Sequence, residues 1–159
     1  MRIEKPVRVS RTYEQTIHAT PDQAFPLYCP VREADWVPGW DPVAVFSDSG
    51  VAEEGCAFVT QDGKTESVWL VTVHDPKLHR VEMIKCTPGV TICRLRIGLK
   101  PKGKTKTTAA ITYSHTSLGP EGDHFVEEFT KEYYEGFMDV WETAMNHYLD
   151  TGDCLDPEA

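Results

Sequence analysis

Six segments rich in β-branched and aromatic residues succeed one another through the middle of this chain. They lie near residues 42–48, 56–61, 66–74, 78–86, 90–99 and 105–117. Short sequences with turn chemistry, such as Asp62-Gly63 and Pro88-Gly89, separate them. Links this short join antiparallel neighbours, because parallel neighbours would need a crossover connection. The sequence therefore predicts an antiparallel meander.

A further strand and some short helical structure come before the meander. In residues 7–17, apolar side chains alternate with polar ones, which is typical of a half-buried strand. Thr20-Pro21-Asp22 then combines a hydroxyl N-cap, a proline at the first helical position and an acid in the first turn. Because prolines interrupt the residues after this start, we expect only one or two short helices within 21–36, ended by Pro38-Gly39.

A long amphipathic segment comes after the β-rich region, from residue 122 to about residue 149. Aromatic and apolar residues recur there at steps of three and four, namely Phe125, Phe129, Tyr133, Phe137, Val140, Ala144 and Tyr148. No proline interrupts the segment, so we expect one continuous helix of roughly 28 residues, about 42 Å long. We expect its acidic face to contact water; this face carries Glu121, Glu128, Glu132, Glu135, Asp139 and Glu142.

These elements predict the α+β fold class. We expect a curved antiparallel sheet of about seven strands, two short helices after the first strand, and the C-terminal helix over the concave face. The 159 residues suit a single domain, which we place at 1–149, with a frayed tail at 150–159. A long helix across a strongly curved sheet leaves a space that large side chains fill or that remains a cavity. The functional predictions depend on that space.

Composition and charge exclude several functions. The net charge of −9 argues against binding nucleic acid through its phosphates. The chain has no apolar run of roughly 20 residues and no apolar N-terminal signal, so we expect no membrane span and a cytoplasmic location. The five cysteines are an odd number without a CxxC pair, which favours reduced thiols. Basic residues cluster between residues 82 and 121, where no acid occurs, whereas residues 121–159 are strongly acidic. We interpret both clusters as solvent-exposed faces of the protein.

The local sequences IHATPDQAF (17–25) and PVREADWVPGW (30–40) resemble those of the SRPBCC superfamily. This superfamily contains the START-related and birch-pollen-allergen-like helix-grip proteins, among them polyketide cyclases, ring-hydroxylase large subunits and lipid-transfer domains. The resemblance covers about residues 7–149 and implies a helix-grip fold that encloses an apolar cavity. It implies no particular reaction, because members share a pocket and not a chemistry.

Motifs for metal, nucleotide and nucleophile chemistry are missing from the sequence. The six histidines have no HxxxH or HExxH spacing, and the chain lacks the inserted segments that carry iron in ring hydroxylases. There is no GxGxxG motif, no P-loop and no G-x-S-x-G elbow. We therefore predict no metal site and no cofactor.

The candidate ligand site is predicted from the strand and helix periodicities. The alternation of 105–117 points Tyr113 and His115 into the concavity, and the helix brings aromatic side chains down onto them. Two tryptophans on the Pro/Gly-rich segment, Trp36 and Trp40, either fill the core or gate the cavity. The predicted ligand-binding set is Tyr13, Trp36, Trp40, Trp69, Tyr113, His115, Phe129, Tyr133 and Phe137. The alternative is that most of these residues only pack and that His115 is structural.

Three functions remain open. The first is binding of a hydrophobic small molecule, aromatic or lipid-like, by a monomer or homodimer. The second is a polyketide cyclase-like enzyme that uses the same cavity, in which His115 or a tyrosine such as Tyr113 transfers the proton. The third is a co-chaperone-like interaction module, suggested by the acidic and basic halves. The sequence identifies no catalytic residue beyond the candidates His115 and Tyr113.

Overall fold

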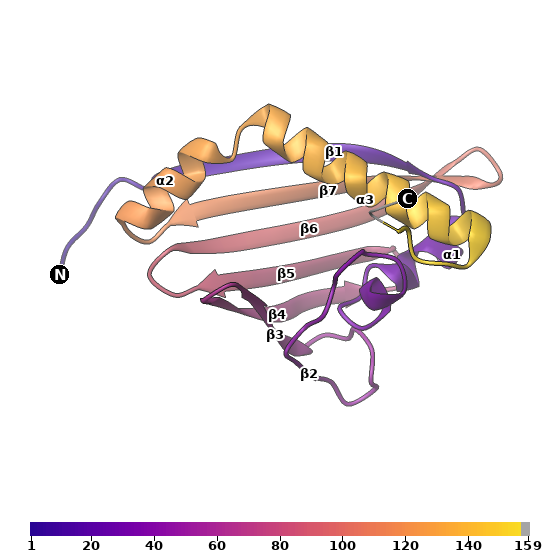
Figure 1. The fold of residues 1–159 in the computed structure, drawn as a ribbon, viewed down its shortest axis with the longest axis horizontal. Coiled ribbons are helices and arrows are strands. Elements are labelled where there is room, and N and C mark those ends of the chain that lie inside the picture. The colour runs from indigo at the N-terminus through magenta and orange to yellow at the C-terminus, as the bar shows by residue number, and fades with distance from the viewer. Residues whose placement is uncertain (157–159) are drawn as a thin grey trace.

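The computed structural model describes residues 1–156 and contains one seven-stranded antiparallel sheet (Figure 1). The spatial order is β1-β7-β6-β5-β4-β3-β2, so consecutive strands from β2 to β7 are neighbours and β1 pairs with β7. This arrangement confirms the predicted meander. The strands are β1 (Arg8–Ile17), β2 (Ala44–Phe46), β3 (Ala57–Asp62), β4 (Thr65–Asp75), β5 (Arg80–Thr87), β6 (Thr91–Lys102) and β7 (Lys106–Ser117).

Helical structure lies in the two regions where the sequence predicts it, although it is divided into more pieces than predicted. Three short pieces come after β1, namely α1 (Pro21–Ala24), η1 (Phe25–Leu27) and η2 (Arg32–Asp35). After the sheet come α2 (Pro120–Glu128) and α3 (Lys131–Thr151). In Figure 1 these last two helices run along the β1–β7 side of the sheet, and α1 lies near the C-terminal end of α3. The layers are those of the predicted α+β fold, with helices over the concave face.

The prediction of one continuous C-terminal helix is wrong, because the helix is broken between α2 and α3. The backbone of Phe129 leaves the helical conformation, and Thr130 caps α3 by accepting a hydrogen bond from the Tyr133 N–H at 3.2 Å. The Arg11 side chain of β1 donates to the Phe129 carbonyl oxygen at 2.7 Å. That bond satisfies a carbonyl at the end of α2, so the break is stabilised from a distant strand.

The break changes which face of α3 contacts the sheet. Tyr134 is 1% exposed, whereas Tyr133, predicted to point inward, is 58% exposed. Val140 of the predicted apolar stripe is also exposed, and the buried residues of α3 are Tyr134, Met138, Trp141, Ala144 and Met145. The apolar residues of 122–149 do not follow one helical repeat, because α3 is a separate helix capped by Thr130. The buried face of α3 is therefore offset from that of α2.

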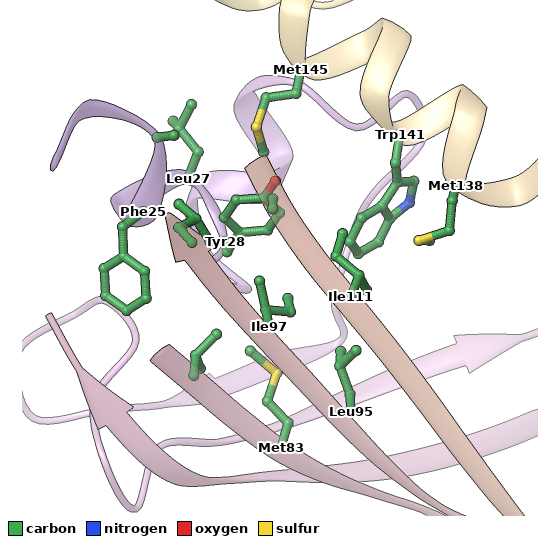
Figure 2. Packing of buried hydrophobic residues seen from close by; sticks show 14 of the residues in the cluster. Phe25, Leu27, Tyr28, Met83, Leu95, Ile97, Ile111, Met138, Trp141 and Met145 are labelled. Carbon is green, nitrogen blue, oxygen red and sulfur yellow. The ribbon is translucent and has the colours of Figure 1, made fainter. Parts of the chain in front are cut away.

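The core lies between α3 and the concave face of the sheet. Figure 2 shows Met138 and Trp141 of α3 pointing toward Ile111 of β7. Buried Gln15 of β1 fastens the helix, because its side-chain amide donates to the Met138 carbonyl oxygen at 3.0 Å. Contrary to the prediction that it faces water, Glu142 is half-buried, and its carboxylate accepts from the Thr16 N–H at 3.0 Å.

The C-terminal helix continues beyond its predicted end at about residue 149. It runs to Thr151, and Gly152 ends it with φ of 83°, the left-handed conformation that glycine adopts easily. Leu155 packs against the core. Residues 157–159 of the predicted tail lie outside the described residues. Within residues 1–156, no helix is long and apolar enough to cross a membrane.

Candidate ligand-binding cavity

A cavity of about 410 Å³ lies between the concave face of the sheet and the helices. Strands β3 to β7, the segment after η2, and both C-terminal helices contribute to its wall. The wall includes exposed residues such as Gln61, Asp62 and Tyr133, so the cavity reaches the protein surface. The aromatic residues of the wall are Trp40, Phe58, Trp69, Tyr113, Phe125, Phe129, Tyr133, Phe137 and Trp141.

The strand register builds one side of this wall. Phe58 of β3 lies opposite Trp69 of β4, and Trp69 lies opposite Lys85 of β5. Lys85 in turn lies opposite Cys93 of β6, which lies opposite His115 of β7. Residues directly opposite each other share a face of the sheet, so these five side chains form a row across the concave surface. We call this row the cross-strand row.

Seven of the nine predicted site residues lie in the cavity wall: Trp40, Trp69, Tyr113, His115, Phe129, Tyr133 and Phe137. Trp36 and Tyr13 lie outside it. The Trp36 indole is fully buried, donates to the Leu27 carbonyl oxygen at 3.0 Å and packs edge-on against Trp141 with ring centroids 5.5 Å apart. Tyr13 is partly buried at the edge of the core. Of the two predicted gate tryptophans, Trp36 is therefore a core residue.

Glu33 is an unexpected member of the wall. It is 4% exposed, and its carboxyl group forms no hydrogen bond with any residue in the described part of the chain. Burial raises the pKa of Glu33 to about 8, because the charged carboxylate is poorly solvated there. At neutral pH the carboxyl group is largely protonated, so it presents both a hydrogen-bond donor and an acceptor.

Lys85 is the lysine of the wall. Its ammonium group lies 5.0 Å from the centroid of the Trp69 ring, within cation–π range. Among residues 1–156, no carboxylate oxygen lies within 4.0 Å of this ammonium group. Burial lowers the pKa of Lys85, while the negative charge of Asp62 opposes that effect.

His115 and Tyr113 lie next to each other in the wall, with ring centroids 5.9 Å apart. The His115 ring also packs against Phe129, at 4.5 Å between centroids, and its Nδ1 atom is buried without a partner in the described chain. Burial lowers the pKa of His115 to about 4 and raises the pKa of Tyr113 well above 10. Both side chains are therefore neutral at physiological pH.

Metal ligands do not gather in the cavity or elsewhere in residues 1–156. No group of three or more His, Cys, Asp or Glu side chains there is arranged to hold a metal ion. The Cys93 thiol lies 3.9 Å from the His115 Nε2 atom, but burial raises the pKa of Cys93 to about 12. The thiol is therefore protonated, and a thiol is a poor nucleophile and metal ligand in that state.

Solved structures with the same arrangement of elements identify the fold. Truncated norcoclaurine synthase from Thalictrum flavum superimposes with a TM-score of 0.71 at 17% identity, covering 95% of this chain and 98% of that one. The protein has the helix-grip fold. The protein named Ara h 8.0201 matches with a TM-score of 0.59 at 12% identity over 89% and 97% of the two chains. DynU16, a putative protein of the dynemicin biosynthetic locus, matches with a TM-score of 0.58 at 17% identity over 92% and 48%.

These likenesses confirm the fold that the resemblance to the SRPBCC superfamily implied, and they show the fold alone. No family model matches the sequence, and no curated protein matches it. The function of this helix-grip protein must therefore be inferred from the residues of its own cavity.

Sequence reasoning missed Glu33 and Lys85 for different reasons. Glu33 belongs to the charged stretch Arg32-Glu33-Ala34-Asp35, which is typical of a solvated turn, and no local pattern marks it as buried. Lys85 carried a usable signal. It comes after buried Val81 and Met83 at steps of two along β5, and that period places it on the concave face.

Proposed function

We propose that this protein binds an aromatic small molecule in the helix-grip cavity. The observation that carries the proposal is the wall itself, in which nine aromatic side chains surround a space of about 410 Å³ that opens to the surface. Small-molecule sites are typically concave, mostly apolar and about 300–1,000 Å³ in volume, with a few polar groups that orient the ligand. Glu33, Lys85 and Tyr113 are such groups here.

The geometry of the rings favours a planar ligand over an alkyl chain. Phe58 and Trp69 are stacked, with centroids 5.1 Å apart and an interplanar angle of 12°, so two parallel rings lie next to each other in the wall. Tyr113 and Phe137 meet edge to face, at 6.0 Å and 72°. A planar aromatic ligand can pack against the ring edges of the first pair and against the rings of the second. In support, norcoclaurine synthase, a protein of the same fold, has been solved with dopamine and hydroxybenzaldehyde, which are both aromatic.

The uncharged fluorescent probe N-phenyl-1-naphthylamine tests this proposal. We expect it to bind with a stoichiometry of one and to gain fluorescence, because the cavity removes it from water. Leu95→Trp, which adds bulk inside the cavity wall, should weaken binding at least about tenfold. Ile92→Trp is the matched control, because Ile92 lies on the same strand but on the exposed opposite face.

Circular dichroism and thermal unfolding would establish that both variants are folded. Absence of saturable binding to the folded wild-type protein would contradict the proposal. Equal binding by Leu95→Trp and Ile92→Trp would place the probe outside the cavity, and would contradict it equally.

The cyclase-like reaction remains a prediction, and the environments of its candidate residues argue for binding instead. With a pKa of about 4, the His115 imidazole is neutral at pH 7 and is only a weak base. Tyr113, with its pKa well above 10, is a weak acid. We expect the protein to perform its binding function in the cytoplasm, as its sequence predicts.

A further inference from the structure

Lys85 is the one lysine or arginine of the cavity wall within residues 1–156. The other lysines of these residues are exposed to solvent. Lys85 is half-buried in an aromatic wall, and Trp69 is the group that its ammonium faces at 5.0 Å. A charge removed from water without a partner costs free energy, and proteins usually pair such a charge or bind an ion there.

The acids of the wall do not supply this partner. Asp41 and Asp62 are exposed residues at the edge of the cavity and lie more than 4.0 Å from the Lys85 ammonium. Glu33 lies on η2, and burial keeps its carboxyl group largely protonated at pH 7, because its pKa is raised to about 8. The wall therefore offers an ammonium group from Lys85 that forms no ion pair within 4.0 Å in the described chain. It also offers a hydrogen-bond donor from Glu33, which forms no hydrogen bond there.

From this arrangement we propose that the ligand is an aromatic acid whose anionic group pairs with Lys85. This inference rests on the proposed function and names the chemical class of its ligand. In this arrangement the ring system of the ligand lies against Trp69 and Phe58. The carboxylate of the ligand lies at the ammonium group of Lys85, the next residue of the cross-strand row after Trp69. An ion pair in this apolar site is screened less than one on the surface, so the charge of the ligand matters strongly.

Two ligands of nearly equal shape isolate the charge, namely 2-naphthoate and the uncharged 2-naphthamide. Isothermal titration at pH 7 and 0.15 M salt would measure both affinities. For the wild-type protein we expect 2-naphthoate to bind at least about tenfold more tightly than 2-naphthamide. Lys85→Met should reduce that ratio to about one through weaker binding of 2-naphthoate. Lys85→Arg should keep the preference for the anion.

Lys100→Met is the matched control, because Lys100 is an exposed lysine of β6. It removes the same charge from the protein and should leave the ratio unchanged. Equal binding of the two ligands by the wild-type protein would overturn this inference and leave aromatic binding intact. A preference that survives in Lys85→Met would overturn it as well. If neither ligand binds, the proposed function itself fails.

Discussion

Replacing Gly122 by alanine is expected to destabilise the protein by about 1–3 kcal/mol and to displace α2 from the sheet. Gly122 is the buried residue of α2, and Val90, which it approaches, lies in the turn between β5 and β6. A Cβ atom at this position would overlap the carbonyl oxygen of Val90 and lie 2.7 Å from the Ser117 Oγ atom. The Val90 oxygen belongs to the backbone and cannot rotate away, so the helix itself must move.

Gly136→Ala is the matched control for this experiment. Gly136 lies inside α3, is exposed, and an added Cβ atom there meets nothing within 4 Å. That change should stabilise the protein by about 0.5–1 kcal/mol, because alanine loses less backbone entropy in a helix than glycine does. Urea denaturation measures both effects. Because α2 contributes Phe125 to the cavity wall, Gly122→Ala should also weaken N-phenyl-1-naphthylamine binding. A Gly122→Ala protein as stable as the wild type would contradict the close helix packing.

Replacing Glu33 by glutamine is expected to change the pH dependence of stability. The folded-state pKa of Glu33 is raised to about 8 from an ordinary value of 4.5. Between these values the folded protein keeps a proton that the unfolded chain releases. The free energy of unfolding therefore falls as pH rises through this window, by about 1.4 kcal/mol per pH unit at most. Glutamine cannot ionise, so the variant should lack this loss.

Urea denaturation at pH 6.5 and pH 8 measures this effect most cleanly. Below pH 6.5 the His115 contribution has the opposite sign, because its folded-state pKa of about 4 makes stability fall as pH falls from 6.5 to 4. Within the chosen window, the difference in stability between Glu33→Gln and the wild type should grow with pH. Glu127→Gln, an exposed acid of α2, is the control and should match the wild type. Parallel pH profiles for Glu33→Gln and the wild type would contradict the buried, protonated state of Glu33.

The sheet could be predicted from sequence because the signals for its strands and turns lie within short stretches of the chain. Alternation within each segment and turn residues such as Asp62-Gly63 determine strand and hairpin, and short links leave only an antiparallel meander. The same alternation places Trp69, Tyr113 and His115 on the concave face, where the structure has them. The apolar period of the C-terminal segment was enough to predict that a helix covers the sheet.

The remaining features depend on contacts between residues far apart in the chain. The break at Phe129 is supported by Arg11, which is 118 residues away, and no local breaker such as proline marks it. A prediction that assumes one continuous helix therefore places Tyr133 on the buried face, whereas in the structure Tyr134 is buried there. Burial of Glu33 likewise depends on how η2 packs in three dimensions, since the neighbouring Trp36 is held by Leu27 and Trp141.

The cross-strand row also separates two kinds of change that this protein can accept. Each strand from β3 to β7 contributes one member of the row, while the residues on either side of that member point to the outer surface, as Ile84 and Cys86 do around Lys85. A substitution within the cross-strand row alters which ligand the cavity binds. A substitution at the next residue along the strand, which faces outward, alters solubility or contacts with other molecules. Selectivity and surface character can therefore diverge independently along the same strands, with the backbone pairing unchanged.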